Sequence, residues 1–285
     1  MIKAPTYLYH YTSLENFVNI LNSNELWMTE VRFLNDNSEL NYAISNYYEN
    51  IQQILANKVK IIQKFRDYES DFDEQSLNEL INILHEFLKK VHKLHSYSFV
   101  FSFSEKGDLL SQWRGYTKFG QGVSIGFNYK ELIDVLHPNL FEYPNKIGRI
   151  GQLLTPCVYS KKKIYERVEG TLLEIFANNF SEGLASIDFS DIWGNCLQIK
   201  HPAFMEESEW RLSAQLSDEN KINHKTGINS IIPIYKNRFE NIKNLIDHII
   251  IGPNPNMEKA IIGLESFLYG KGINIEVSKI PYDGL

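Results

Sequence analysis

The most constraining feature of this chain is an alternation of apolar and small polar residues over "SYSFVFSFSE", residues 96–105. A period of two places successive side chains on opposite faces of a β-strand. The apolar positions are Tyr97, Phe99, Phe101 and Phe103, and the positions between them are Ser98, Val100, Ser102 and Ser104. The segment "GVSIGF" at residues 122–127 repeats this pattern. Both segments predict strands of a sheet with one apolar face.

Further strands are predicted near the start and in the second half of the chain. They are "LYHYT", "ELWMTE", "EWRLSAQL", "INSIIPIY", "IDHIIIG" and "INIEVSKI". Apolar residues recur at helical spacing through residues 37–95, again after "TPCVYS", and around "MEKAIIGLESFLYG". This arrangement favours the α+β class over a doubly wound sheet. We expect one domain of residues 1–285 with mixed or antiparallel sheets and a helical insertion at about residues 37–95.

Composition limits the classes of function. With 285 residues, 43% of them hydrophobic, the chain can bury a sizeable core, so a disordered chain is not expected. The formal net charge of −6 argues against a generic nucleic-acid binder, because sequence-independent affinity for phosphates needs clustered Lys and Arg. A local basic groove is still compatible with this charge.

The two cysteines, Cys157 and Cys196, fit neither a disulfide framework nor a zinc site, so we expect both to be small buried side chains in a reducing compartment. The N-terminal segment "MIKAPTYLYHYT" lacks the apolar region of a signal peptide. No apolar stretch reaches the roughly 18 residues that a bilayer span needs. A cytoplasmic protein without a membrane partner is therefore expected.

The first predicted strand carries polar groups on His10, Tyr11 and Thr12, where Val or Ile would suit a strand better. Alternation places His10 and Thr12 on one face and Tyr11 on the other. Ser13 can cap the helix that follows, and the N-terminus of a helix favours an anion. These residues are candidates for binding a nucleotide. The alternative is a strand histidine that is hydrogen-bonded internally and binds nothing.

Two later segments extend the candidate site. Ser102 and Ser104 are small enough to let a planar ligand lie against the sheet, although alternate serines on a solvent-facing strand are the commoner explanation. Trp113, Arg114 and Tyr116 in "SQWRGY" are rich in recognition chemistry for a short helix and loop. The alternative for this segment is an aromatic plug that covers the sheet and leaves Arg114 exposed.

The segment "HPAFMEESEWRL" supplies candidate acids. Glu207 and Glu209 stand two residues apart at the start of a predicted strand, so we expect their carboxylates on one side, with Arg211 beyond them. Trp210 and Leu212 on the opposite face would pack on a core and give the carboxylates a rigid support. The alternative is a solvated acidic edge.

The spacing of potential ligands predicts no metal site. The remaining candidates are His85, His92, His95 and His201. Asp36 and Glu39 could begin the acidic cluster of a metal-dependent nuclease, but a turn and a helix cap already explain both. The chain has no G-x-G-x-x-G, Walker or G-x-S-x-G motif, which argues against the usual dehydrogenase, P-loop and hydrolase classes.

Five blocks of the sequence resemble the bacterial DUF2971 family, a domain of unknown function. They are "YHYTS", "FLNDNSE", "FSFSEKGDLLSQWRGY", "GVSIGF" and "HPAFMEESEWRL", in this order. The resemblance extends over roughly residues 8–213, and "SQWRGY" and "ESEWRL" are its most specific parts.

The opening segment "YHYTS", with its following helix, is also similar to ADP-ribosyltransferases of the His-Tyr-Glu type, including DarT-like toxins. In those enzymes a strand histidine holds the nicotinamide-side ribose, a tyrosine stacks on nicotinamide, and a late-strand glutamate binds the ribose 2′-hydroxyl. His10 matches the first role and Glu209 the last. Serines of "FSFSE" stand where that class has tyrosine, and Tyr116 or a nearby aromatic residue is the expected substitute.

The resemblance implies an ADP-ribosyltransferase-like fold with NAD as substrate and no metal. Cleavage of the nicotinamide N-glycosidic bond builds positive charge on the ribose, which the carboxylate of Glu209 would stabilise in the transition state. Glu207 would orient the acceptor, His10 and Thr12 would hold ribose, and Arg114 would contact the pyrophosphate.

The leading hypothesis is therefore an NAD-dependent ADP-ribosyltransferase-like enzyme, which modifies a macromolecule or hydrolyses NAD. Family analogy adds a role as a toxin or antiphage effector. The alternatives are a non-catalytic nucleotide sensor on the same scaffold and a metal-dependent nuclease-type effector. The acceptor, whether protein, nucleic acid or water, stays open. We expect His10 and Glu209 on neighbouring strands of one sheet, facing a common cleft with Trp113 or Tyr116 at its rim.

Overall fold

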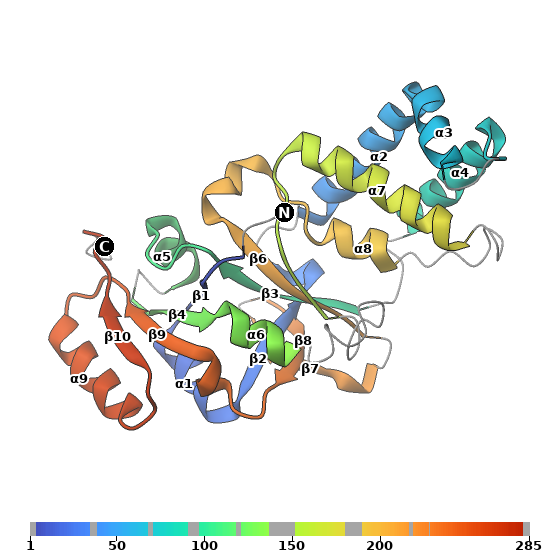
Figure 1. The fold of residues 1–285 in the computed structure, drawn as a ribbon. Coiled ribbons are helices and arrows are strands. Elements are labelled where there is room, and N and C mark those ends of the chain that lie inside the picture. The colour runs from blue at the N-terminus through green and yellow to red at the C-terminus, as the bar shows by residue number, and fades with distance from the viewer. Residues whose placement is uncertain are drawn as a thin grey trace. The chain divides into compact units, whose positions relative to one another are not determined.

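The computed structural model describes residues 4–34, 39–67, 71–90, 97–117, 121–136, 152–179, 190–216, 219–227 and 229–281. The chain divides into two compact units (Figure 1). Unit 1 consists of Met1–Phe33, Tyr97–Pro156 and Glu206–Leu285, and unit 2 consists of Leu34–Ser96 and Cys157–Met205. Segments of the two units alternate along the chain. The prediction of a single domain over residues 1–285 stays a prediction.

Unit 1 is built on a ten-stranded sheet. Its strands are β1 (Tyr7–Thr12), β2 (Glu25–Glu30), β3 (Tyr97–Ser104), β4 (Val123–Asn128), β5 (Leu153–Pro156), β6 (Glu209–Leu216), β7 (Ile222–Thr226), β8 (Ile231–Arg238), β9 (Ile246–Ile251) and β10 (Asn274–Val277). The main order is β10-β9-β4-β1-β3-β2-β8-β7, while β6 pairs with β3 and β5 with β6. Only the β9–β10 pair among these is parallel, so the sheet is mixed.

Strand β3 has three partners, and their arrangement creates a fork. β6 pairs with β3 along its whole length, from Tyr97 to Ser104. β1 joins the opposite edge at Ser104, and β2 joins that same edge at Phe99 and Val100. Between these contacts, Phe101–Phe103 on this edge of β3 face the place where β1 and β2 separate. We call this place the fork.

The helices of unit 1 connect and flank these strands. They are α1 (Leu14–Ser23), α5 (Leu110–Tyr116), α6 (Tyr129–Leu136) and α9 (Met257–Leu268), with short 3₁₀ turns η1 (Val31–Phe33), η5 (Glu219–Lys221) and η6 (Ile242–Leu245). The predicted cap of α1 is confirmed, because the Ser13 side chain accepts a hydrogen bond from the Asn16 backbone N–H at 3.1 Å. Asn24, in the left-handed conformation, ends this helix.

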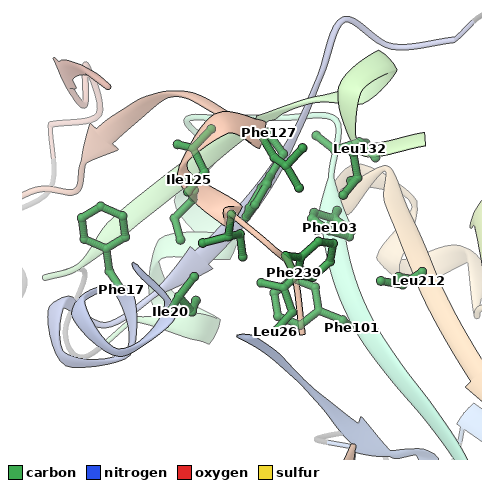
Figure 2. Packing of buried hydrophobic residues seen from close by; sticks show 14 of the residues in the cluster. Phe17, Ile20, Leu26, Phe101, Phe103, Ile125, Phe127, Leu132, Leu212 and Phe239 are labelled. Carbon is green, nitrogen blue, oxygen red and sulfur yellow. The ribbon is translucent and has the colours of Figure 1, made fainter. Parts of the chain in front are cut away.

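The main core of unit 1 lies on one face of the sheet, and the strand alternation explains its composition. Phe99, Phe101 and Phe103 of β3 are all buried there, as the alternation predicted. Figure 2 shows Phe101 and Phe103 among side chains from α1, β2, β4 and β6. We call this side of the sheet the core face. The opposite side, which carries Ser102 and Ser104, is called the polar face.

Unit 2 is helical in its described part. It contains α2 (Glu39–Ala56), α3 (Lys58–Arg66), α4 (Glu74–Lys90), α7 (Lys161–Asn179) and α8 (Ser190–Cys196), and a 3₁₀ turn, η4 (Pro202–Glu207), follows at the change to unit 1. Helix α2 packs against α3, α4, α7 and α8. The predicted helical block at 37–95 thus shares a unit with later helices. Cys157 and Cys196 are buried free thiols, as expected.

The fold confirms the α+β class with a large mixed sheet. Strands β2 and β6 coincide with "ELWMTE" and "EWRLSAQL", whereas the short strands β5 and β7 were not predicted. Both are edge segments with weak alternation, and pairing with a longer neighbour explains their formation. Among the described residues, no helix combines the length and the apolar character that a bilayer span requires.

Candidate functional site

A buried ionic group lies at the start of β6. The Oε1 atom of Glu209 accepts hydrogen bonds from the Ser102 hydroxyl at 2.7 Å and from the Arg211 Nε at 2.8 Å. Its Oε2 accepts a third bond from Arg211 Nη2 at 3.2 Å. Side chains of both ionic partners are only 5% exposed. Because an ion pair with this little exposure is poorly screened by solvent, its attraction is strong, and the three hydrogen bonds hold the carboxylate in one place.

His10 lies at the fork. Its Nδ1 is 2.9 Å from the backbone carbonyl oxygen of Ser102, so Nδ1 carries the proton and donates to that oxygen. The imidazole packs on the ring of Phe101, with 4.1 Å between ring centroids. Burial lowers the pKa of His10 to about 4, the bond to Ser102 opposes this shift, and the positive charge of Lys225 adds to it. The imidazole is therefore neutral near pH 7, with Nε2 as a hydrogen-bond acceptor.

Ser102 links the two predicted catalytic residues. Its carbonyl oxygen orients His10, and its hydroxyl donates to Glu209. His10, Ser102 and Glu209 thus lie on three consecutive strands, β1, β3 and β6. The sequence treated Ser102 only as a small side chain beneath a ligand, and its role as a link depends on the tertiary structure.

The expected placement of His10 and Glu209 is wrong in two respects. Their strands are not neighbours, because β3 lies between them. Tyr9 pairs with Ser104, which pairs with Glu209, so these three side chains share the polar face. His10 follows Tyr9 and therefore points to the core face, beside Phe101. Pairing between distant strands sets these faces, and alternation within a single strand does not reveal it.

Glu207 does not share a strand face with Glu209. Glu207 ends η4, and β6 begins only at Glu209. Between them, Ser208 has a positive φ of 43°, so the two-residue period of a strand does not apply here. The Ser104 hydroxyl donates to the Glu207 carbonyl oxygen at 2.6 Å and holds this turn against β3. The strand argument for two parallel carboxylates is therefore wrong, and the role of Glu207 stays a prediction.

Tyr11 and Trp113 pack together on the polar face. Their rings meet edge to face at a centroid distance of 4.7 Å, and Trp113 is completely buried. The Tyr11 hydroxyl donates to the Lys106 carbonyl oxygen and accepts from the Leu109 N–H, while Trp113 Nε1 donates to Asp108 at 2.7 Å. Of the two residues expected at the rim of a cleft, Trp113 is thus buried, and Tyr116 stays the candidate. The placement of Trp113 matches the aromatic-plug alternative.

The remaining predicted residues differ in exposure. Thr12, at the end of β1, is buried, and a Cβ atom on Gly122 would come within 2.3 Å of its carbonyl oxygen, so the backbone is tightly packed there. Arg114 is exposed on α5, which both the ligand contact and the aromatic-plug alternative predict, and Tyr116 is 40% exposed. Their predicted contacts with NAD stay predictions.

Other features were found only in the structure. Lys225 and Thr29 approach each other near the fork, and neither belongs to a sequence pattern that marked a site. A hollow of about 350 Å³ in unit 2 is lined by α2 and the start of α7, far along the chain from every predicted site residue. Within the described ranges, no three His, Cys, Asp or Glu side chains are grouped as metal ligands. Asp36, from the nuclease alternative, lies outside these ranges.

The fold and site define a mixed α+β protein with a buried Glu–Arg pair joined to a strand histidine through one serine. A family model described as "Protein of unknown function (DUF2971)" matches residues 112–212, from α5 to the middle of β6. The chain therefore contains a DUF2971 region, and the predicted resemblance to that family is supported over residues 112–212 of the predicted 8–213. No curated protein and no solved structure matches the chain.

Proposed function

We propose that this protein is an NAD-dependent ADP-ribosyltransferase-like enzyme, which transfers ADP-ribose to a macromolecule or to water. One observation carries the proposal: His10, Ser102 and Glu209 are joined by hydrogen bonds across three consecutive strands. A neutral imidazole and a fixed carboxylate are the two groups that the resemblance requires. Ser102, on the strand where that class has tyrosine, instead positions both of them.

His10 would bind a hydroxyl group of the nicotinamide-side ribose. Because Nδ1 donates to the Ser102 carbonyl oxygen, the neutral ring offers Nε2 as an acceptor for a sugar hydroxyl. The ring is fixed by the carbonyl oxygen on one side and by Phe101 on the other. A side chain fixed in this way loses little entropy when it binds the sugar.

Glu209 would stabilise the reacting sugar. The bond between the ribose C1′ atom and the nicotinamide nitrogen breaks, and its electron pair leaves with nicotinamide. The ribose carbon becomes cationic until an oxygen or nitrogen of the acceptor bonds to it and gives up a proton, for which Glu207 is the proposed base. Glu209 lies on the opposite face of the sheet from His10, so the proposal requires the ribose to reach both groups past Ser102. A buried carboxylate near the ribose lowers the energy of the cationic transition state more than that of bound NAD.

Exposed residues of α5 would complete NAD binding. Arg114 is the proposed contact for the pyrophosphate, and Tyr116 is the proposed stacking partner for nicotinamide. The resemblance also suggests that such an enzyme acts as a toxin or antiphage effector.

A second candidate function is a nucleotide sensor that binds NAD without cleaving it. The Arg211–Glu209 ion pair favours this alternative, because a carboxylate neutralised by a buried guanidinium stabilises a developing cation less well. Both candidate functions use the same His10 contact, so nicotinamide release, and not binding alone, distinguishes them.

The test is release of nicotinamide from NAD by purified protein, with and without cell extract as a source of acceptor. Glu209→Gln keeps the shape of the side chain and removes its charge, so turnover should fall by about 10²–10³-fold while NAD affinity changes little. Glu265→Gln, an exposed site on α9, is the matched control and should keep wild-type turnover. Thermal melts would confirm that both variants are folded.

His10→Ala should lower NAD affinity and turnover together, because it removes a contact made before and during bond cleavage. Release of nicotinamide by Glu209→Gln at the wild-type rate would contradict the catalytic assignment. If every variant binds NAD but the wild type releases no nicotinamide with any acceptor, the result would instead support the nucleotide sensor.

A further inference from the structure

Lys225 directs its ammonium group inward along the sheet. It lies on β7, and its Nζ atom is 3.4 Å from the Thr29 hydroxyl on β2, across the intervening strand β8. The strand pairing places both residues on the polar face. Thr29 pairs with Val100 of β3 and with Ile234 of β8. Lys225 pairs with Ile232, which lies on the same side of β8 as Ile234. The polar face is also the face of Ser102, Glu209 and Arg211.

The charge of Lys225 is poorly compensated. An ammonium group has three N–H donors, and the structure shows a single long bond to a neutral hydroxyl. Within the described residues, no carboxylate oxygen lies within 4.0 Å of Nζ. Partial burial lowers the pKa of Lys225, which reflects the cost of keeping this group charged away from water. An anionic ligand would remove much of that cost.

Another lysine on the polar face has its positive charge compensated in the usual way, by a carboxylate of the protein. Lys236 of β8 lies 3.9 Å from Glu25 and stacks over the ring of Trp27 at 4.8 Å. In unit 2, the buried Lys200 likewise lies 3.5 Å from Glu39. In both cases the protein provides its own carboxylate. At Lys225 the described residues provide only a hydroxyl group, and this is the arrangement expected where the counter-charge comes from a ligand.

The positive charge of Lys225 adds a small contribution to the low pKa of His10, although His10 points to the core face and Lys225 to the polar face. In a nucleotide, phosphate is the group whose negative charge such an ammonium group would neutralise.

We propose that Lys225 and Thr29 form a phosphate-binding point on the polar face of the sheet, and that it takes a phosphate group of a nucleotide. The ammonium group would neutralise the phosphate, and the Thr29 hydroxyl would donate a second hydrogen bond. The assignment of that phosphate to NAD rests on the proposed function. The phosphate-binding point itself can be tested without NAD.

The experiment is a calorimetric titration of the full chain with inorganic pyrophosphate, which measures the binding affinity. Lys225→Met should weaken binding by about 10-fold or more, the scale of a lost charged hydrogen bond. Lys221→Met removes the same charge from an exposed position four residues earlier and should leave the affinity within about twofold of the wild type. Lys225→Arg keeps the positive charge and should retain most of the pyrophosphate affinity. Thr29→Val removes only the hydroxyl group and should weaken binding severalfold.

Equal pyrophosphate affinity in the wild type and Lys225→Met, or no saturable binding by the folded wild type, would overturn the proposal. The two proposals fail separately. If the wild type releases no nicotinamide but pyrophosphate binding depends on Lys225, only the proposed reaction is wrong. If NAD is cleaved but Lys225→Met weakens neither NAD nor pyrophosphate, only the phosphate-binding point is wrong.

Discussion

The two edges of β3 hold their functional side chains by different means. On the β6 edge, Glu209 is fixed by charge, with Arg211 and Ser102 supplying three hydrogen bonds to one carboxylate. On the β1 edge, His10 is fixed by shape, with one bond to a backbone carbonyl oxygen and an aromatic ring against its face. The same residue of β3, Ser102, supports both sides.

This difference shows how one sheet can place two ionisable groups in very different surroundings. Burial among apolar rings favours the neutral imidazole, because the charged form would lose its hydration. On the polar face, the guanidinium favours the ionised carboxylate. Because the two groups lie on opposite faces of the sheet, each keeps its own surroundings, and only Ser102 contacts both.

The largest loss of stability is expected when the ion pair between Glu209 and Arg211 is broken. Arg211→Met leaves Glu209 buried without its cation, and removing one partner of a buried pair costs about 3–5 kcal/mol of the free energy of unfolding. Lys89→Met is the matched control, because Lys89 pairs with Glu86 at the surface, where the two side chains are 63% and 58% exposed, so its loss should cost less than about 1 kcal/mol. Urea unfolding of both variants measures the difference, and equal losses would contradict it.

The histidine side should respond to pH. The pKa of His10 is about 4 in the folded protein and about 6.5 in an unfolded chain, so between these values the unfolded state binds more protons. The free energy of unfolding should therefore be highest above pH 6.5 and fall as the pH decreases towards 4, by up to about 3 kcal/mol from this group.

His10→Gln should flatten this part of the pH profile in urea unfolding measurements between pH 7.5 and 4.5. His224→Gln, at an exposed position on β7, should leave the slope unchanged. If wild type and His10→Gln show the same slope, His10 is not held neutral by its surroundings.

The smallest effect is expected at the link between the two sides. Ser102→Ala removes one bond to a carboxylate that keeps its bonds from Arg211, so the loss should be about 2 kcal/mol. The backbone carbonyl oxygen that binds His10 remains. The pH slope assigned to His10 should therefore persist in Ser102→Ala, and its disappearance would show that the two sides are more tightly coupled than the structure indicates.

Some of the site could be predicted from local pattern. Alternation identified β3 and its apolar side, and the segment "EWRLSAQL" gave the bounds of β6. Local pattern failed at Glu207, because the positive φ of Ser208 interrupts the strand period before β6 begins. It also failed at Trp113, since a tryptophan in a short amphipathic segment has the same sequence signature whether it faces a ligand or a core.

The sequence by itself determined most of the elements, the α+β class, the cap of α1 and the resemblance to DUF2971, because each depends on residues close together in the chain or on recognisable blocks. Only the tertiary structure decided that β1 and β2 share an edge of β3, that His10 and Glu209 lie on opposite faces, and that Lys225 reaches Thr29. Pairing register between distant strands controls all three. A one-residue shift in the pairing register would move every side chain of a strand to the opposite face of the sheet. The energies that select the register come from packing across the whole sheet.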